Sequence, residues 1–279
     1  MREIMADEIV STVAELCIRA CTLLPGDVDA ALEKAGRTER FPKAREILGV
    51  LSENADIARN TGIPICQDTG TAVVFVDLGQ DVHVQGSLMD AVREGVSQGY
   101  VRGYLRKSMV ADPLRRTNTG DNTPPMVHVR MVEGDRLTLT VAPKGAGSEN
   151  MSRLAMLTPG QGVAGVRRFV METVKLAGAN PCPPMILGIG IGGNFETVAL
   201  LAKEALLEPL DRVHPDPFYA NLEQELLAEV NASGIGPQGL GGDTTCLSVK
   251  IRALPCHIAS LPVAVNVSCH ATRHASAVL

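Results

Sequence analysis

The sequence contains no tryptophan, and aromatic residues make up only 3% of its 279 residues. A core must therefore be built from aliphatic side chains, and the 45% hydrophobic content is sufficient for one large domain or two smaller ones. We see no run of about 20 apolar residues, so no membrane span is expected. Acidic residues stand early in the N-terminal segment, which argues against a secretory signal and favours the cytoplasm.

The sequence also lacks a basic tract, and its formal net charge is −5. This balance argues against a general nucleic-acid-binding protein. No Cys-x-x-Cys pair occurs among the seven cysteines, which argues against structural zinc and against a ferredoxin-type electron carrier. An odd number of widely spaced cysteines is typical of buried thiols, metal ligands or catalytic groups. They are Cys17, Cys21, Cys66, Cys182, Cys246, Cys256 and Cys269.

Prolines surround Cys182 in the segment 180–184 and should hold it on a stiff loop. The residues that follow predict a short strand over 185–187, a glycine turn over Gly188–Gly193 and a helix over 195–207. Such a turn suits a phosphate or a carboxylate. Two other interpretations stay open: a dinucleotide-binding turn, whose usual spacing and acidic residue are missing, and glycines that let a helix pack on a strand.

The remaining pattern predicts a mixed α/β (α+β) fold, with small mixed sheets flanked by helices. We expect one unit over 1–279, made of a helical lead-in over 1–61 and a core over 62–279. The expected core elements are helices over 87–105, 162–177 and 217–232, strands over 72–78, 245–251 and 263–267, and a hairpin of strands 127–132 and 137–141. The polar loop 115–125 should be ordered. The glycine loops 142–150, 188–193 and 234–243 should converge near Cys66, Cys182 and Cys269.

Two isolated cysteines, Cys66 and Cys182, stand in loops rich in glycine or proline, so the finished fold could gather them with a third cysteine as metal ligands. A cubane held by three thiolates leaves one iron to act as a Lewis acid on a substrate hydroxyl, while a nearby base handles the C–H proton. Asp68 is a candidate base, and Arg106 a candidate carboxylate clamp. Each residue also has a structural interpretation, as a buried thiol, a loop cap or a surface charge.

Several motifs run in order from about Gly62 to the end of the chain. They are Ile65–Gly70 (ICQDTG), Asn118–Pro124 (NTGDNTP), Lys144–Asn150 (KGAGSEN), Cys182–Gly193 (CPPMILGIGIGG) and Ser268–His274 (SCHATRH). This set resembles the iron–sulfur hydro-lyases of the class I fumarate hydratase and L-tartrate dehydratase family. The similarity is to the N-terminal domain of the one-chain enzymes, or to the α subunit of the two-chain enzymes.

The resemblance implies a 4Fe–4S cluster ligated by Cys66, Cys182 and Cys269, with one iron open to a small dicarboxylate. Cys246 and Cys256 are not implied as ligands, because the family's third ligand stands in the Ser-Cys-His segment. The resemblance further implies that substrate carboxylates are held by Gln67, Arg106 and the backbone at Gly147. Asp68 would act as acid or base, and His257 would lie near the cluster as a second catalytic residue.

The resemblance also implies a separate β subunit that carries the C-terminal domain of the one-chain enzymes, and a heterotetramer of two α and two β chains. A large apolar surface should then face the partner. The expected reaction is hydration of fumarate to L-malate, with dehydration of L-tartrate as the alternative. Two other functions stay open, a non-catalytic scaffold subunit and a nucleotide-binding protein that uses Gly188–Gly193.

Overall fold

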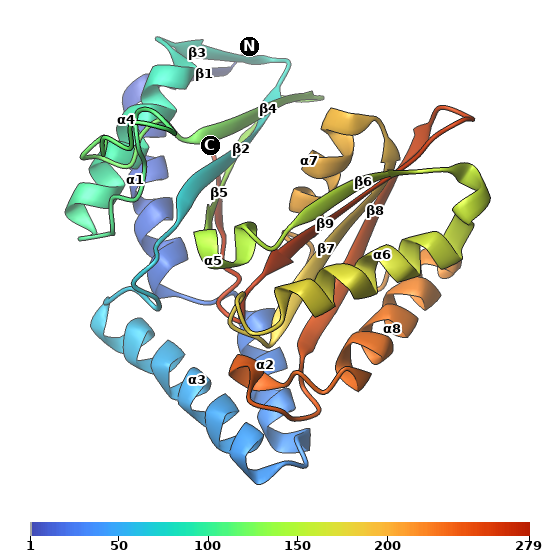
Figure 1. Cartoon of the computed structure of the whole chain (residues 1–279). Coiled ribbons are helices and arrows are strands. Elements are labelled where there is room, and N and C mark those ends of the chain that lie inside the picture. The colour runs from blue at the N-terminus through green and yellow to red at the C-terminus, as the bar shows by residue number, and fades with distance from the viewer. Residues whose placement is uncertain (1) are drawn as a thin grey trace. The chain divides into compact units, whose positions relative to one another are not determined.

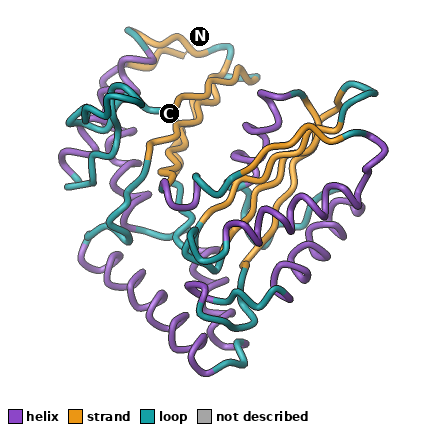
Figure 2. The backbone as a smooth tube through the Cα atoms, in the orientation of Figure 1, coloured by secondary structure: helices purple, strands orange, loops and turns teal. Residues whose placement is uncertain are grey.

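The computed structural model describes residues 2–279 and contains two compact units, each with its own sheet and hydrophobic core (Figure 1). Unit 1 comprises Met1–Pro25, Ala55–Ala146 and Arg273–Leu279, and unit 2 comprises Gly26–Asn54 and Gly147–Thr272. Helices and mixed sheets both contribute, as the predicted α/β class requires (Figure 2). The segment expected as a helical lead-in is shared between the units and therefore does not stand apart from a core.

Unit 1 contains a four-stranded sheet in the order β10-β5-β2-β4 and a two-stranded parallel sheet of β1 and β3. Two helices, α1 and α4, pack against each other, and α1 also packs on β5. The elements are β1 Arg2–Met5, α1 Ala6–Thr22, β2 Thr71–Gly79, β3 Val82–Gln85, α4 Leu88–Arg102, β4 Met126–Val132, β5 Leu137–Lys144 and β10 Ala275–Val278.

The predicted hairpin of residues 127–132 and 137–141 is wrong. Both segments are strands, β4 and β5, but β2 lies between them. Val74 of β2 is paired with Val127 in a parallel register and with Val141 in an antiparallel register. The continuous apolar run of β2 explains this arrangement, because a strand buried on both faces is most stable in the interior of a sheet.

Helix α1 forms the centre of the unit 1 core, with Ile9, Val13 and Cys17 on its buried face. A Cβ at Gly99 of α4 would lie 2.8 Å from the Ala14 carbonyl oxygen, so this glycine permits close packing of the two helices. By length and composition, the helical region Ala6–Thr38 could cross a membrane, since its most apolar 18-residue window has a mean hydropathy of 1.4. Half of that window is buried, as in the core helix of a folded unit.

Unit 2 contains a four-stranded sheet in the order β6-β9-β7-β8. Helix α7 packs on one face of this sheet, whereas α6 and α8 share a core with β7, β8 and β9 on the other (Figure 1). The elements are α2 Gly26–Thr38, α5 Ala146–Glu149, β6 Arg153–Leu157, α6 Gly162–Ala177, β7 Met185–Gly193, α7 Phe195–Ala205, α8 Pro217–Ala232, β8 Cys246–Cys256 and β9 Leu261–Ser268. Helix α3, Pro42–Thr61, begins in unit 2 and ends in unit 1.

The predicted glycine turn over Gly188–Gly193 is also wrong, because these residues belong to β7. A Cβ at Gly188 would lie 2.1 Å from the Ala202 carbonyl oxygen, and a Cβ at Gly190 would lie 2.3 Å from that of Val198. The glycines therefore let α7 pack directly on the strand, which was one of the open interpretations. The anion-binding and nucleotide-binding interpretations of this segment lose their structural basis.

A buried carboxylate, Glu39, fastens the end of α2 to the glycine-rich loop that precedes β8. Its side chain is 1% exposed. It accepts hydrogen bonds from the backbone N–H of Phe41 and Asp243, both at 3.1 Å, and from the Thr244 backbone N–H at 3.0 Å and hydroxyl at 2.8 Å. The neighbouring Arg40 makes a bidentate pair with Asp243 at 2.6 and 2.8 Å. The loop is thus held by residues about 200 positions away in the sequence.

We expect Glu39→Gln to lower the free energy of unfolding by about 2 kcal/mol near pH 7. The carboxylate accepts hydrogen bonds at two oxygens, whereas the amide of glutamine has one oxygen and would place an NH₂ group in the position of the other. Burial acts to raise the pKa of Glu39, but hydrogen bonds from Asp243, Phe41 and Thr244 together outweigh it and lower the pKa. The stabilisation is therefore complete above the unfolded-state pKa of about 4.3 and is lost as the pH falls through the folded-state value. Urea titrations at a series of pH values measure both effects.

The matched control is Glu33→Gln, since Glu33 forms an exposed ion pair with Arg37. That change should cost less than about 0.5 kcal/mol. An equal, small loss in the two variants would contradict the role assigned to Glu39.

Candidate functional site

The loop that carries Cys66 and Asp68 lies in unit 1 between α3 and β2. It closes at Gly70, whose φ is 76°. A Cβ at Gly70 would lie 2.5 Å from the carbonyl carbon of Lys144, so no other residue fits there without displacing the backbone of β5. The conformation of the loop is thus fixed by the close approach of two backbone segments.

The Asp68 carboxylate is half-buried and oriented by backbone groups. Its Oδ1 accepts from Gly70 N at 3.0 Å, and its Oδ2 accepts from Ala146 N at 2.8 Å. On the main chain, Asp68 O accepts from Arg273 Nη2 at 2.6 Å. Asp68 is therefore a loop cap, as its structural interpretation proposed, and it is also a pre-organised carboxylate next to a half-buried Cys66.

Arg106 lies on the long loop between α4 and β4, and this loop is ordered around Asn122, which is fully buried. The Asn122 Oδ1 accepts from Ser108 N at 2.7 Å, and its Nδ2 donates to Gly70 O at 3.1 Å. Thr69 Oγ1 donates to Arg106 O at 3.1 Å. These bonds join the Arg106 loop to the Asp68 loop within unit 1, while the Arg106 side chain stays exposed. The prediction that the segment 115–125 is ordered is confirmed.

No role was predicted for Arg273, whose side chain lies beside Asp68. It is 5% exposed, and besides Asp68 it interacts with Cys21 at the end of α1. Burial raises the pKa of the Cys21 thiol to about 11, and Arg273 opposes this increase. The only indication in the sequence was the position of Arg273 inside the Ser268–His274 motif.

In unit 2, the loops that carry Cys182 and Cys269 contact each other through His270. The His270 N–H donates to Cys182 O at 3.4 Å, and the His270 Nδ1 lies 3.0 Å from the same oxygen. Thr272 closes the second loop, since its N–H and hydroxyl donate to Cys269 O at 3.1 and 2.8 Å. The structure thus brings two of the three predicted ligand loops together in one unit.

The cysteines fall into two groups by accessibility. Cys17, Cys21 and Cys246 are buried, and burial raises the thiol pKa at all three, to about 12 at Cys246. A buried thiol with a raised pKa is a poor source of thiolate. The predicted ligands are accessible instead: Cys182 is exposed, and Cys66 and Cys269 are half-buried. Cys256 is exposed as well, so accessibility alone does not separate it from the ligands.

The structure does not place His257 beside Cys182 and Cys269. Register pairs Gly193 with Cys256 at one end of β7 and Ile186 with Ser268 at the other. His257 therefore follows the far end of the sheet, and the 9 residues of β7 put about 26 Å between the two ends. The His257 Nδ1 accepts a hydrogen bond from Ala259 N at 3.1 Å. This bond gives His257 a structural role in an exposed turn.

Gly147, the remaining predicted binding residue, is exposed in the short helix α5 and is the first residue of its segment of unit 2. A Cβ there would lie 3.5 Å from Asn180 O, an ordinary contact, so the fold does not itself require glycine. The end of α5 is fixed by Glu149, which pairs with Lys203 at 2.5 Å and accepts from Asn266 Nδ2 at 3.0 Å. Gln67 is exposed beside Cys66 in unit 1.

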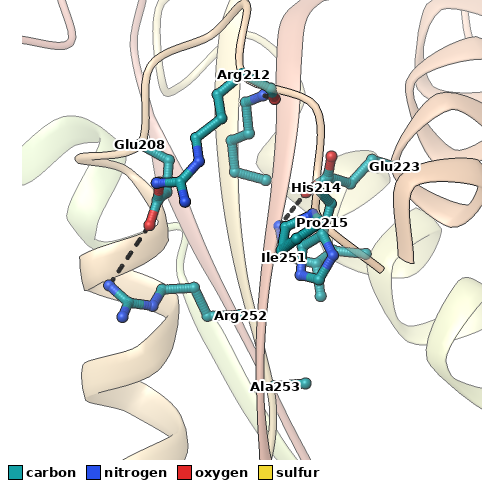
Figure 3. Close-up of a pocket in the computed structure, with 9 residues that line it drawn as sticks. Glu208, Arg212, His214, Pro215, Glu223, Ile251, Arg252 and Ala253 are labelled. Carbon is teal, nitrogen blue, oxygen red and sulfur yellow. Dashed lines mark hydrogen bonds and ion pairs between the residues drawn. The ribbon is translucent and has the colours of Figure 1, made fainter. Parts of the chain in front are cut away.

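A polar cavity of about 180 Å³ opens beside β8 in unit 2 and contains none of the predicted site residues (Figure 3). Three of its charged side chains form ion pairs, Arg212 with Glu208 at 2.7 Å and Arg252 with Glu208 at 3.6 Å. Desolvation raises the pKa of Glu223 and lowers that of Lys250. We interpret the cavity as a satisfied ion-pair network that covers the outer edge of β8.

The donor types fit an iron–sulfur cluster, since accessible thiolates are the ligands that such clusters select. Between residues 2 and 279, no group of three or more His, Cys, Asp or Glu side chains is gathered into a metal site. The predicted ligand set is divided, with Cys66 in unit 1 and both Cys182 and Cys269 in unit 2.

Comparisons with known proteins test the resemblance of the chain to the hydro-lyase family. Residues 10–278 match the family described as Fumarate hydratase (Fumerase). A Methanocaldococcus jannaschii protein whose name places it with the L(+)-tartrate dehydratase α subunits is 42% identical, with 96% of each chain covered. The L(+)-tartrate dehydratase subunit alpha of Escherichia coli strain UTI89 is 32% identical, and that of Shigella sonnei is 31% identical. Both alignments cover 96% of this chain and 89% of the relative.

Proposed function

Because the chain belongs to the fumarate hydratase (Fumerase) family and is a hydro-lyase α subunit, we propose that it acts in an L-tartrate dehydratase. The observation that carries this proposal is the match over 96% of the chain to proteins named L(+)-tartrate dehydratase subunit alpha. In this reaction one carbon of L-tartrate loses a proton and its neighbour loses hydroxide. The resulting enol tautomerises to oxaloacetate.

Fumarate is the second candidate substrate, because the matching family is described as fumarate hydratase. From the sequence we expected fumarate first and L-tartrate second, and the names of the relatives favour the reverse order. The hydroxy acids of the two reactions, L-malate and L-tartrate, are both four-carbon dicarboxylates and differ by one hydroxyl group. A binding site can separate them only through polar contacts to that hydroxyl.

We propose that Cys66, Cys182 and Cys269 hold a 4Fe–4S cluster. When bound, it supplies a Lewis acid that polarises the C–O bond of the departing hydroxyl. The buried thiols Cys17, Cys21 and Cys246 are unsuited to this role because their pKa values are raised. Cys256, the last residue of β8, is paired with Gly193 at the opposite end of β7 from Cys182 and Cys269, which supports its exclusion.

The protein side chains would bind the substrate and move its proton. We assign the proton transfer to Asp68, whose carboxylate is oriented by Gly70 N and Ala146 N. Arg106 would bind one substrate carboxylate through its exposed guanidinium, since its loop is joined to the Asp68 loop. Gln67 and the backbone at Gly147 are assigned to the remaining carboxylate contacts. His257 can take part only if its exposed turn reaches the substrate from another chain.

We further propose a β subunit as partner, in a heterotetramer of two α and two β chains. The name "subunit alpha" carried by the relatives supports a partner of this kind. Exposed apolar side chains on both units, among them Tyr104, Leu114 and Ile258, each at least 90% exposed, offer surface that a partner could bury. We place the complex in the cytoplasm.

The test is an assay of the protein purified without oxygen, together with its β partner, against L-tartrate, L-malate and fumarate. We expect kcat/KM for L-tartrate to exceed that for L-malate at least tenfold. The opposite ratio would assign the protein to fumarate hydration. Turnover of none of the three, with substrate binding unchanged in Arg106→Ala, would point to a non-catalytic scaffold subunit.

A further inference from the structure

The loop that presents Cys182 has few backbone donors of its own. Positions 181, 183 and 184 are prolines, which have no N–H. The two remaining backbone donors are already used within the same segment. Asn180 N donates to Ala177 O, at the end of α6, and Cys182 N donates to Ala179 O, both at 3.0 Å. A bond that fixes the backbone on the other side of this loop must therefore be made to its carbonyl oxygens.

The backbone of Cys182 also has an unusual conformation. Its φ is 54°, in the left-handed region that residues with a Cβ seldom adopt. Such a conformation persists only when its surroundings determine it. Since the backbone donors of the loop are already hydrogen-bonded to preceding residues, groups from elsewhere in the fold must hold Cys182 in this conformation.

Two residues supply those groups, one from each of two distant segments. Gln238 donates twice to Pro183 O, from its backbone N–H at 2.8 Å and from its side-chain Nε2 at 2.9 Å. His270 approaches Cys182 O with both its backbone N–H and its Nδ1. A carbonyl oxygen can only accept, so the close Nδ1 contact fits the tautomer with a proton on Nδ1. The Gln238 Nε2 lies 3.4 Å from that nitrogen, so the two side chains pack together.

Gln238 is itself fixed by an anchored loop. It has a φ of 53° in a segment otherwise rich in glycine, although a residue with a Cβ is disfavoured there. A Cβ at Gly236 would lie 2.1 Å from the carbonyl carbon of Gly241, so the loop is tightly closed. Gly236 N donates to Thr245 Oγ1 at 3.0 Å, and Glu39 holds the residues that follow. The loop that carries Gln238 is thus held in place by hydrogen bonds to Thr245 and Glu39.

From these contacts we infer that Gln238 is a positioning residue for the proposed cluster, which fixes the backbone of Cys182 and, by packing against His270, the spacing of Cys182 from Cys269. The inference rests on the proposed function for its purpose, but its structural claim concerns residues of unit 2 alone. This role does not require Gln238 to contact a thiol or a substrate. It acts by holding the carbonyl of Pro183.

The decisive variant is Gln238→Gly, which keeps the left-handed backbone and its N–H donor but loses the side-chain bond. Gln238→Glu is the second variant, since it keeps the shape of the side chain and replaces the Nε2 donor by an oxygen that repels Pro183 O. Leu240→Ala is the matched control, because Leu240 lies in the same loop and its side chain is exposed. Thermal unfolding checks that all three proteins are folded at the assay temperature.

The first measurement needs no cluster. In cluster-free protein, iodoacetamide labelling of Cys182 is followed by peptide mass spectrometry, with the exposed Cys256 in each sample as the reference thiol. Loss of one hydrogen bond should change the labelling rate of Cys182 about fivefold in Gln238→Gly and Gln238→Glu, and leave Cys256 unchanged. Unchanged labelling of Cys182 in both variants would overturn the inference.

The second measurement uses reconstituted protein. We expect both Gln238 variants to bind iron under anaerobic conditions but to lose it about three to ten times faster in air than wild type and Leu240→Ala, with an altered electron paramagnetic resonance signal. Iron loss at the wild-type rate would overturn the link to the cluster. If wild type itself takes up no iron, the proposed function fails, and the labelling experiment alone decides whether Gln238 fixes Cys182.

Discussion

Asp68→Asn should abolish turnover while the protein keeps its iron. A positioned acid or base contributes a factor of about 10² to 10⁴, so we expect the turnover of the complex with its β partner to fall by at least about 100-fold. An amide keeps the size of the side chain but cannot exchange the substrate proton. The bonds from Gly70 N and Ala146 N will be only partly conserved, because Asn offers one acceptor oxygen instead of two.

The comparison that isolates this effect is Asp216→Asn. Asp216 is also a carboxylate that caps backbone, since its Oδ1 accepts from Phe218 N at 2.9 Å at the start of α8. Asparagine is an equally good N-cap, so turnover and stability should be unchanged there. Turnover of Asp68→Asn within twofold of wild type would remove Asp68 from the chemistry. Loss of iron in the same variant would mean that Asp68 shapes the loop of Cys66 instead.

Each of the three substitutions Cys66→Ser, Cys182→Ser and Cys269→Ser should remove most of the bound iron. Wild-type protein reconstituted without oxygen should hold about four irons and four sulfides per chain, the composition of a cubane cluster. A serine hydroxyl is a hard, weakly acidic ligand and does not replace a thiolate in such a site. Iron and sulfide analysis, together with the absorption spectrum, measures the loss in each variant.

Cys246→Ser and Cys256→Ser serve as the controls in this series. Both should retain the wild-type iron content, because Cys246 is buried with a raised thiol pKa and Cys256, the last residue of β8, is paired with Gly193 at the far end of β7. Cys246→Ser should cost some stability, since it puts a hydroxyl in an apolar core. Iron loss at Cys256→Ser but not at Cys269→Ser would reassign the third ligand. A wild-type protein that takes up no iron would make all of these cysteines structural.

Local sequence patterns predicted single elements well. Helix α6 has the predicted bounds, and α8 begins at the predicted proline, with Asp216 as its cap. Ser87 caps α4 by accepting from Asp90 N, as the spacing of the two residues indicated. In each case the deciding interactions join residues within one or two turns of the chain, so periodicity and capping residues are sufficient.

The same patterns did not predict which strands pair, or whether a run of glycines forms a turn or part of a strand. A separation of four residues between 132 and 137 suggested a hairpin, yet both strands pair with β2. The glycines of β7 were compatible with a turn or with a strand under a closely packed helix, and the choice depends on the position of Val198 and Ala202 of α7. Long-range contacts of this kind leave no periodic trace in the sequence.

The sequence by itself determined the family, the mixed α/β class and the loops in which the accessible cysteines stand, because these depend on motifs and on residues with fixed backbone preferences. Tertiary structure alone decided which side chains meet. It gave Asp68 its backbone donors and Arg273 as neighbour, set Gln238 against Pro183, and put His257 at the far end of a strand from Cys182. The reason is physical: each of these contacts joins segments that are distant in the sequence and meet only when the core of their own unit packs, and packing depends on the whole chain.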